Sequence, residues 1–401
     1  MIDRLTITNF KAFAAADIPL GPYTLLSGLN SSGKSTVLQA LALLRQAYDQ
    51  DMLHDTDDSA GFPLNGTLVQ LGTGQDVLHE DYISEPGADP EIGFRLSAEQ
   101  SPSREWRARY GREDDLLPLT ACVPSEEDRA FGDLEEVDPL FTLFNNGFQY
   151  LRADRVNPAV TYPRSYEMSA RRGFLGAHGE FTVDYLAQHQ DDVIQQDVLH
   201  HPAATRRLLE QVEAWMSEIC PGVRIQAAVI ERTDLMRLGF QFTRPGQVVS
   251  APRRPTNVGF GLGYVLPIVV ACLTAAPGAM LLLENPEAHV HPQGQSAMAR
   301  LTCAAASAGA QVIVETHSDH ILNGVRLAVK RGQIPADDVI LHYFDRQDDG
   351  VHITSPIMGA DGMLSQWPLG FFDEWDRSID QLLELTQSAS GISERGAECP
   401  S

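Results

Sequence analysis

The chain has 401 residues, of which 43% are apolar, and its formal net charge is −24. At roughly 150 residues per domain, this length predicts two to three structural units with enough apolar surface for a core, so stability requires no disulfide or metal. A chain this acidic does not coat nucleic acid as a whole, although its composition still allows a local basic patch.

The acidic charge is concentrated in one stretch. Residues 49–138 contain 23 acidic residues and six arginines and carry −17 of the net charge. The five cysteines include no CxxC pair, which argues against a disulfide framework or a structural zinc site. No signal peptide is evident. The apolar run 264–283 is interrupted by prolines and a glycine, so we expect a buried helix and strand rather than a membrane span, in a cytoplasmic protein.

Short-range patterns predict the first elements. Residues 4–8 alternate between polar and apolar, as in a half-buried strand, and a second short strand ends within 23–27. From Ser35 onward, apolar positions recur at helical spacing. Residues 49–138 are rich in turn formers, and we expect them to form an elaborated surface region of short strands and loops rather than a compact core.

The rest of the chain mixes helical and strand patterns. Helical spacing within 181–219 precedes two strands within 223–243. The elements expected next alternate, in the order helix 262–275, strand 279–284, helix 293–308, strand 310–315, helix 319–331 and strand 339–344. Such alternation predicts a parallel sheet with crossover helices. The small, polar residues 386–401 are expected to be a disordered tail.

A phosphate-binding pattern joins the second strand to the first helix. The segment reads Gly28-Leu29-Asn30-Ser31-Ser32-Gly33-Lys34-Ser35-Thr36 and matches G-x-x-x-x-G-K-S in full. Its glycines let backbone amides surround a polyphosphate at a helix N-terminus, while the lysine reaches the β- and γ-phosphates and the serine can ligate Mg²⁺. The sequence therefore predicts a nucleoside triphosphate site.

Two later strands end in polar residues. Strand 279–284 delivers Glu284 where a carboxylate can contact Mg²⁺. The alternative is a core strand with an exposed glutamate at its end. Residues 311–315 form a second buried strand that leads to His317, where a polar side chain can sense the γ-phosphate. For the pair His289 and His291 no third ligand spacing is evident, so a structural or subunit-contact role is favoured over a metal site.

The order of these motifs carries a family resemblance. The segments that carry it are Leu5–Phe10 (LTITNF), the phosphate-binding loop, 257–264 (NVGFGLGY), 281–292 (LLLENPEAHVHP), 315–322 (ETHSDHIL) and 361–374. The chain resembles ATP-binding-cassette-type ATPases of the SMC, RecF and overcoming-lysogenization-defect (OLD) group. Within that group it is most similar to bacterial AAA-family ATPases whose C-terminal part is a domain of unknown function. The resemblance covers roughly 1–80 and 250–375 and covers the middle only weakly.

The resemblance implies a set of roles. The loop residues from Gly28 to Thr36 would hold the phosphates. The metal would be bound by Ser35, by Glu284 and by Gln70 as a Q-loop residue. His317 would be the switch histidine. A signature loop that meets the nucleotide of a second subunit would consist of Gly259, Phe260, Gly261 and Gly263. The implied cofactors are ATP and Mg²⁺, and the implied active species is a homodimer with ATP between its subunits.

Two residues depart from the family pattern. The position after the Walker B acid, usually a glutamate that activates water, is Asn285, and an amide cannot accept a proton. Losing a general base typically costs about 10²–10⁴ in rate, so either Glu287 or another group substitutes or hydrolysis is slow. Gly263 replaces a serine found in many relatives, and a backbone N–H would have to compensate. Both departures concern turnover rather than ATP binding.

Partner modules of the group are not evident in this sequence. We find no long heptad run, and Asp345 with Asp348 and Asp349 fits a solvated hairpin tip better than the metal site of a nuclease. Basic clusters are modest. Arg164, Arg171 and Arg172 are the candidate DNA-facing patch, whereas Arg326, Lys330 and Arg331 fit a solvated helix face.

These observations predict an α/β P-loop ATPase head with a mixed sheet, flanking helices and an inserted middle region. The expected parts are an N-terminal lobe (1–160), a helical and β insertion (161–250), a C-terminal lobe (251–385) and the tail. The expected function is ATP binding with slow hydrolysis coupled to dimerisation, acting with a separately encoded effector in prokaryotic genome maintenance or defence against phage. The alternatives are a non-hydrolysing ATP-gated scaffold or sensor, and a RecF-like DNA-binding repair protein.

Overall fold

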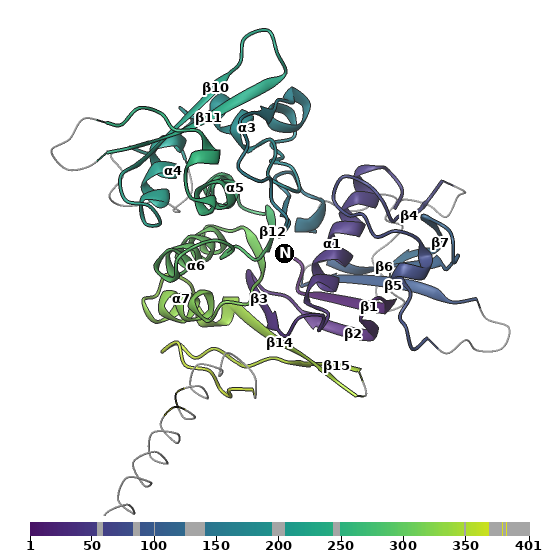
Figure 1. Ribbon diagram of the computed structural model, residues 1–401. Helices are drawn as coiled ribbons and strands as arrows, with labels where there is room; N and C mark the ends of the chain where they lie inside the picture. Colours follow the sequence, from purple (N-terminus) through teal and green to yellow (C-terminus); the bar gives the residue numbers. More distant parts are fainter. Residues whose placement is uncertain are drawn as a thin grey trace, which may run out of the picture.

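The computed structural model describes most of the chain (Figure 1). The described residues are 1–53, 59–82, 89–99, 101–124, 141–194, 205–243, 249–348, 350–368, 379 and 382. The tail expected at 386–401 lies outside them.

An antiparallel sheet forms the N-terminal lobe. Its strands in the described residues are, in spatial order, β2 (Phe13–Pro19), β1 (Arg4–Phe10), β5 (Glu91–Ala98), β6 (Ser101–Arg109), β7 (Leu116–Pro124) and β4 (Gly61–Pro63). The sequence patterns predicted β1 but not β2, which pairs with β1 across a tight turn.

The expectation of a surface elaboration at residues 49–138 is wrong for the described strands β5, β6 and β7. They make up half of the antiparallel sheet and contribute buried side chains such as Phe94 and Trp106, both at most 1% exposed. In β5, the buried residues Ile92, Phe94 and Leu96 alternate with outward-facing ones such as Arg95. This period-two pattern places polar side chains on one face and a core on the other, while nearly all of the acidic residues of 49–138 lie outside the strands.

The central sheet carries the phosphate-binding loop. Its described strands are, in order, β15 (Gly350–Thr354), β14 (Val339–Gln347), β3 (Tyr23–Gly28), β13 (Gln311–Glu315), β12 (Met280–Glu284) and β8 (Gln149–Leu151). All pairs are parallel except β14 with β15, so the sheet is mixed, as the sequence predicted. The carboxyl ends of β3, β13 and β12 consequently meet at one edge, where parallel sheets bind ligands.

Helices cover both faces of the central sheet. The longer ones are α1 (Lys34–Asp49), α5 (Phe260–Thr274), α6 (Pro292–Ser307) and α7 (Asp319–Lys330). Figure 1 places α1 between the central and antiparallel sheets, with α6 and α7 on the opposite face. Neighbouring residues of β12 belong to two hydrophobic cores. Leu281 and Leu283 pack with α5, α6 and α7, whereas Leu282 packs with α1 and the antiparallel sheet.

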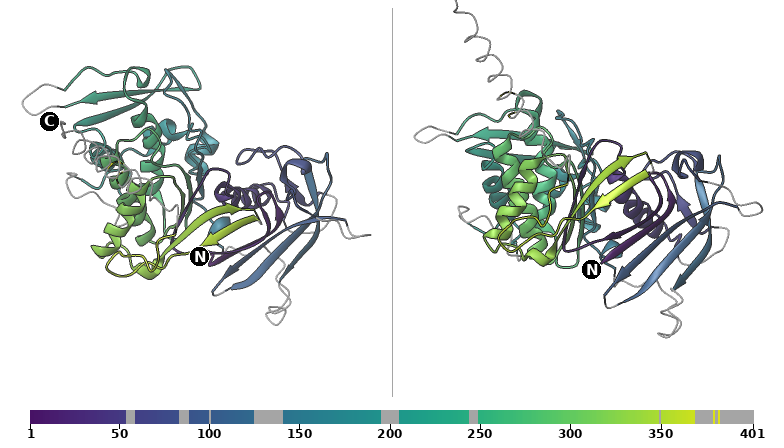
Figure 2. Two further views of the ribbon diagram at one scale, coloured as in Figure 1. Left: turned by 60° about the horizontal axis from the view of Figure 1, so that its bottom comes forward. Right: turned by 90° about the horizontal axis from the view of Figure 1, so that it is seen from below.

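The middle region packs against α5. It comprises a small sheet of β10 (Val223–Val229), β11 (Leu235–Phe242) and β9 (Tyr162–Pro163), with α3 (Thr182–His189) and α4 (Leu208–Ser217). Figure 2 shows this region beside α5 and apart from the antiparallel sheet. The remaining short helices are α2 (Gly74–Val77), η2 (Thr142–Phe144), the π-helical turn η3 (Glu167–Arg171), η4 (Pro255–Asn257) and η5 (Ala336–Asp338). No described helix is both long enough and apolar enough to cross a bilayer.

Candidate nucleotide site

The phosphate-binding loop leads from β3 directly into α1. Gly28 has a φ of 142°, and a Cβ there would lie 2.1 Å from the carbonyl oxygen of Phe344 in β14. Gly33 precedes α1 with a φ of 98°, and a Cβ there would lie 2.9 Å from the ring of Phe13. Only glycine fits at both positions. The loop can therefore wrap closely around the N-terminus of a 16-residue helix, which is an anion-binding arrangement.

Lys34 is held inside this loop. Its side chain is buried, and Nζ donates to the carbonyl oxygens of Gly28 at 3.1 Å and Leu29 at 2.6 Å. Burial lowers the pKa of the ammonium, while the nearby Glu315 carboxylate opposes this shift. The present partners are neutral carbonyls, so a phosphate would offer the ammonium a stronger, charge-assisted partner.

A cavity of about 590 Å³ opens at the loop, within the size range of small-molecule sites. Its lining combines the loop and α1 with residues from five other places in the fold. The residues are Lys11, Ala12, Asn30, Ser31, Ser32, Gly33, Lys34, Ser35, Thr36, Gln39, Gln75, Asp76, Leu78, Glu80, Asn285, Glu315, His317 and Arg346. Most of the loop residues expected from the sequence to hold phosphates therefore share one cavity.

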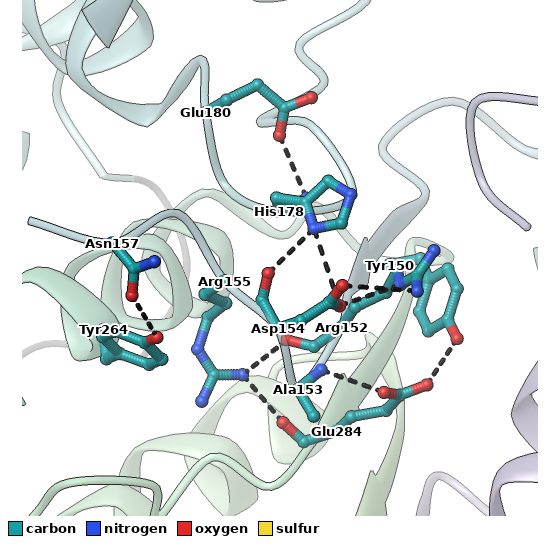
Figure 3. A network of polar contacts seen from close by, with 10 residues as sticks. All are labelled: Tyr150, Arg152, Ala153, Asp154, Arg155, Asn157, His178, Glu180, Tyr264 and Glu284. Atoms are coloured by element: carbon teal, nitrogen blue, oxygen red, sulfur yellow. Dashed lines mark hydrogen bonds and ion pairs between the residues drawn. The ribbon is translucent and has the colours of Figure 1, made fainter. Parts of the chain in front are cut away.

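Glu284 does not line this cavity, and its carboxylate is directed toward Tyr150 and Ala153 (Figure 3). One oxygen accepts a short hydrogen bond from the Tyr150 hydroxyl, and the other accepts from the backbone N–H of Ala153 at 2.9 Å. Both partners belong to β8 and the loop that follows it. In this structure, the acid that the sequence assigns to the metal therefore faces the neighbouring strand.

A different carboxylate faces the phosphate-binding loop. Glu315, the last residue of β13, is 5% exposed and lines the cavity. Its Oε1 accepts a hydrogen bond of 2.8 Å from the Ser35 hydroxyl, and its Oε2 is buried without a partner. Burial, with repulsion from Glu284, raises the pKa of Glu315 to about 7. Sequence reasoning overlooked this residue although it directly precedes Thr316 and His317.

Asn285 and His317 also line the cavity, whereas Glu287 does not. Asn285 has a φ of 43°, its backbone N–H donates to Glu315 O at 2.8 Å, and its Oδ1 is buried without a partner. Glu287 accepts from the backbone N–H of His317 at 2.9 Å, and burial raises its pKa. Burial and the positive charge of Lys34 lower the pKa of His317, which favours a neutral imidazole.

Gln70 lies away from the cavity. It is exposed and pairs through its backbone with Asn65, whereas Gln75 of α2 lines the cavity.

Lys11 was also missed by sequence reasoning. Its Nζ donates to Gln39 Oε1 at 2.7 Å on the cavity wall. A usable signal existed, because Lys11 is one of only three lysines in the chain.

The loop expected from the resemblance to be the signature loop lies at the exposed N-terminus of α5 rather than in the cavity. Phe260 is 56% exposed, and a Cβ on Gly259 would meet nothing within 4 Å. Gly261 is tighter, since a Cβ there would lie 2.5 Å from the carbonyl oxygen of His289. Gly263 lies near Pro158. This separation from the chain's own cavity is compatible with a loop that meets a second subunit.

The oxygen atoms beside the loop fit a magnesium ion. Mg²⁺ prefers hard oxygen ligands, and the Ser35 hydroxyl, the unpartnered Glu315 Oε2 and the unpartnered Asn285 Oδ1 belong to residues of one cavity wall. By contrast, no group of three or more His, Cys, Asp or Glu residues suited to a metal occurs in the described ranges, including around His289 and His291.

Family models match three separate parts of the chain. A model described as AAA ATPase domain matches residues 1–80, and one described as AAA domain, putative AbiEii toxin, Type IV TA system, matches 249–323. A model described as Protein of unknown function (DUF3696) matches 334–382. The first two matches contain the phosphate-binding loop and the segments with Glu284 and Glu315.

Two curated relatives are similar over different lengths. The chain is 25% identical over 381 residues to the OLD nuclease of Thermus scotoductus, which covers 87% of this chain and 65% of the relative. It is 37% identical over 89 residues to the DNA replication and repair protein RecF of Mesorhizobium japonicum, which covers 19% of this chain and 23% of the relative. The chain thus spans just under two thirds of the first protein and about a quarter of the second.

Among solved structures, an SMC head bound to the C-winged helix domain of ScpA superposes with a TM-score of 0.49 at 15% identity, covering 88% of this chain and 97% of that one. The SMC head domain from Thermotoga maritima gives a TM-score of 0.41 at 12% identity, with 88% and 98% covered. The fold assignment rests on the strand order and on the loop between β3 and α1.

A phosphate-binding loop after β3, with β13 between β3 and the strand that ends in Glu284, defines an ABC-type P-loop ATPase head. The chain is similar in sequence to AAA ATPase domains, to an OLD nuclease and to RecF proteins, and its C-terminal part matches DUF3696.

Proposed function

We propose that the chain binds ATP with Mg²⁺ in the cavity around the phosphate-binding loop and hydrolyses it slowly. The observation that carries this proposal is the cavity of about 590 Å³ that brings Lys34, Ser35 and His317 together at the N-terminus of α1. The backbone of the loop would hold the phosphates, and Lys34 would exchange its carbonyl partners for phosphate oxygens. When bound, Mg²⁺ would neutralise phosphate charge.

Slow turnover follows from the residues around the γ-phosphate position. Asn285 lines the cavity but has no proton-accepting group, while Glu284 and Glu287 are engaged outside the cavity. The neutral imidazole of His317 can form a hydrogen bond in the cavity without adding charge. The cavity therefore lacks a carboxylate at position 285, and any activation of water would fall to Glu315 or His317.

The test measures ATP binding and phosphate release by the full chain. Lys34→Ala should abolish both, because it removes the buried ammonium of the cavity. The matched control is Lys330→Ala, which removes an exposed lysine at the end of α7 and should change neither quantity. ATP binding that survives Lys34→Ala with unchanged affinity would contradict the proposal.

We further propose that ATP joins two copies of the chain through the signature loop. This loop begins a helix at an exposed position outside the chain's own cavity, where its amides are available to a partner's nucleotide. Gly259→Glu would place a negative charge against that nucleotide without a clash, since Gly259 has no neighbour within 4 Å of its Cβ position. Light scattering should detect an ATP-dependent dimer for the wild type and for Gly259→Gln, and only a monomer for Gly259→Glu.

The biological role that we propose is prokaryotic genome maintenance or defence against phage through a separately encoded effector. The support is similarity to an OLD nuclease and to RecF proteins. Co-purification of the tagged chain from its native host, with and without ATP, tests for the effector. An ATP-independent set of bound proteins, identical for the wild type and Lys34→Ala, would speak against ATP-driven coupling.

A non-hydrolysing ATP-gated scaffold is the second candidate, and Asn285 is the observation that favours it. It predicts ATP-dependent dimerisation without phosphate release even when DNA and effector are present. Turnover that disappears in Lys34→Ala would exclude it.

A RecF-like DNA-binding role is the third candidate. Arg171 is the last residue of η3 and Arg172 follows it, and they form exposed ion pairs with Glu167 at 2.9 and 3.3 Å, which reduces the net charge of the expected patch. Arg164 is likewise paired with Asp184 at 3.6 Å. The role predicts ATP-dependent DNA binding that weakens steeply with salt and is lost on reversing the charge of Arg171 and Arg172. Salt-independent binding would reject it.

A further inference from the structure

Three glutamates end or follow the strands beside the phosphate-binding loop, and their carboxylates point to different places. Both oxygens of Glu284 are occupied by Tyr150 and the backbone of Ala153. Figure 3 shows this carboxylate directed toward β8, and Glu284 does not line the nucleotide cavity. For Glu284 to serve a cation at the loop, these two hydrogen bonds would have to break.

The second carboxylate, that of Glu287, supports the backbone rather than the cavity. Its Oε1 accepts from the N–H of His317 at 2.9 Å and thereby fixes the turn after β13. Its Oε2 is buried without a partner, but the residue does not line the cavity.

Glu315 is the one of the three that faces the nucleotide cavity. Its Oε1 lies 2.8 Å from the Ser35 hydroxyl, and its Oε2 is buried without a partner. A buried carboxylate oxygen without a partner is unusual and is often explained by an ion or water that binds there. Asn285, whose backbone N–H donates to Glu315 O at 2.8 Å, adds a second unpartnered oxygen at the same edge of the sheet.

We propose that Glu315 and Ser35 together hold the Mg²⁺ of the bound nucleotide, in the place that the sequence pattern assigns to Glu284. This inference rests on the proposed function because it concerns the same cavity. A hydroxyl and a carboxylate are ligands that Mg²⁺ accepts, and their mutual hydrogen bond keeps the two groups adjacent before the cation arrives.

The proposal also explains why an amide is suitable at position 285. The backbone of Asn285 is bonded to that of Glu315, so a glutamate there would bring a second carboxylate toward the first. A neutral amide offers an oxygen to the cation without adding repulsion when the site is empty of it.

The experiment compares nucleotide affinity in Mg²⁺ and in EDTA, using a fluorescent, non-hydrolysable ATP analogue and the full chain. The dissociation constant in EDTA divided by the dissociation constant in Mg²⁺ measures how strongly Mg²⁺ supports binding. Glu315→Gln should reduce this ratio by at least about tenfold, as ligand-shell substitutions do in metal sites, while the affinity in EDTA stays close to that of the wild type. Ser35→Ala should act in the same direction, and Glu284→Gln should preserve the ratio.

Manganese provides a second readout that is independent of turnover. With the analogue present, the electron paramagnetic resonance of Mn²⁺ should report bound metal for the wild type and Glu284→Gln but weak binding for Glu315→Gln. Thermal melting without ligand establishes that each variant is folded.

The outcomes are distinguishable. Loss of the magnesium effect in Glu284→Gln, with an unchanged ratio in Glu315→Gln, would overturn this inference and return the metal to Glu284. Equal ratios in both variants and the wild type would also overturn it. Failure of the wild type to bind the analogue, in Mg²⁺ and in EDTA alike, would instead overturn the proposed function itself.

Discussion

Arg155 and Asn285 are joined by a buried hydrogen bond in which Arg155 Nη2 donates to the Asn285 carbonyl oxygen at 2.7 Å. The Nη1 of the same guanidinium donates to the carbonyl oxygen of Glu284, also at 2.7 Å (Figure 3). The ring of Tyr264 in α5 lies 5.6 Å from the guanidinium carbon. Burial lowers the pKa of Arg155 to about 10, so it remains charged at neutral pH. One buried cation thus connects the turn after β12 to the helix that begins at the signature loop.

Removing this cation should destabilise the fold. Arg155→Met would remove the hydrogen bonds that the guanidinium donates to the carbonyl oxygens of Arg152, Glu284 and Asn285, and we expect the free energy of unfolding in urea to fall by about 2–3 kcal/mol. The control is Arg152→Met, since Arg152 pairs at 3.0 Å with the exposed Asp154, an interaction worth less than about 1 kcal/mol. Similar losses of unfolding free energy in the two variants would show that the contacts of Arg155 stabilise the fold no more than the exposed ion pair of Arg152.

Gly28 and Gly259 should respond oppositely to alanine. Gly28→Ala forces a Cβ to within 2.1 Å of the Phe344 carbonyl oxygen at a φ of 142°, so we expect a large loss of both melting temperature and ATP binding. Gly259 has a φ of −61° and no neighbour within 4 Å, so Gly259→Ala should leave the melting temperature nearly unchanged. Differential scanning fluorimetry with and without ATP measures both. A tolerated Gly28→Ala would mean that the loop does not pack against β14 in solution.

Turnover should respond to a base at position 285. Asn285→Glu adds a proton acceptor to the cavity wall, and we expect phosphate release to rise by at least about tenfold, because general bases typically contribute 10²–10⁴. ATP affinity should change little, since the loop and Lys34 are untouched. Asn285→Gln is the matched control, which lengthens the side chain without adding a base. Equal rates of phosphate release in the two variants would show that a missing base at position 285 does not limit turnover.

His342 should make stability depend on pH. The Nε2 of this buried histidine donates to Pro19 O at 2.7 Å, so in the neutral imidazole Nδ1 accepts from the Ser355 hydroxyl at 2.8 Å. Burial lowers its pKa, so the folded chain resists a proton that the unfolded chain takes up below about pH 6.5. Stability should therefore fall as the pH decreases below that value and level off below the folded pKa.

The check is the melting temperature between pH 7.5 and 5.5 for the wild type and His342→Gln. Glutamine keeps hydrogen-bonding capacity but does not titrate, so its melting temperature should decline less on acidification. Parallel curves would assign the pH dependence to other groups.

Local patterns in the sequence determined much of this fold. The helices and strands expected between residues 262 and 344 all occur, with ends within a few residues, because apolar spacing reflects which faces each element buries. The strand, loop and helix around Lys34 were equally clear, since the required glycines and lysine occur within nine consecutive residues. The antiparallel sheet was missed because acidic residues outside its strands dominate the composition of residues 49–138, whereas β5, β6 and β7 contain only two acidic residues, Glu91 and Glu105.

What the tertiary structure decided is which carboxylate meets the loop. Glu284 and Glu315 both end buried strands, and nothing in their local sequence distinguishes the directions of their side chains. The difference comes from partners far along the chain. Tyr150 holds Glu284 across 134 positions, and Ser35 holds Glu315 across 280. Local periodicity predicts the elements and the motifs on them, whereas the direction of a side chain at the edge of a sheet depends on the strands that pack beside it.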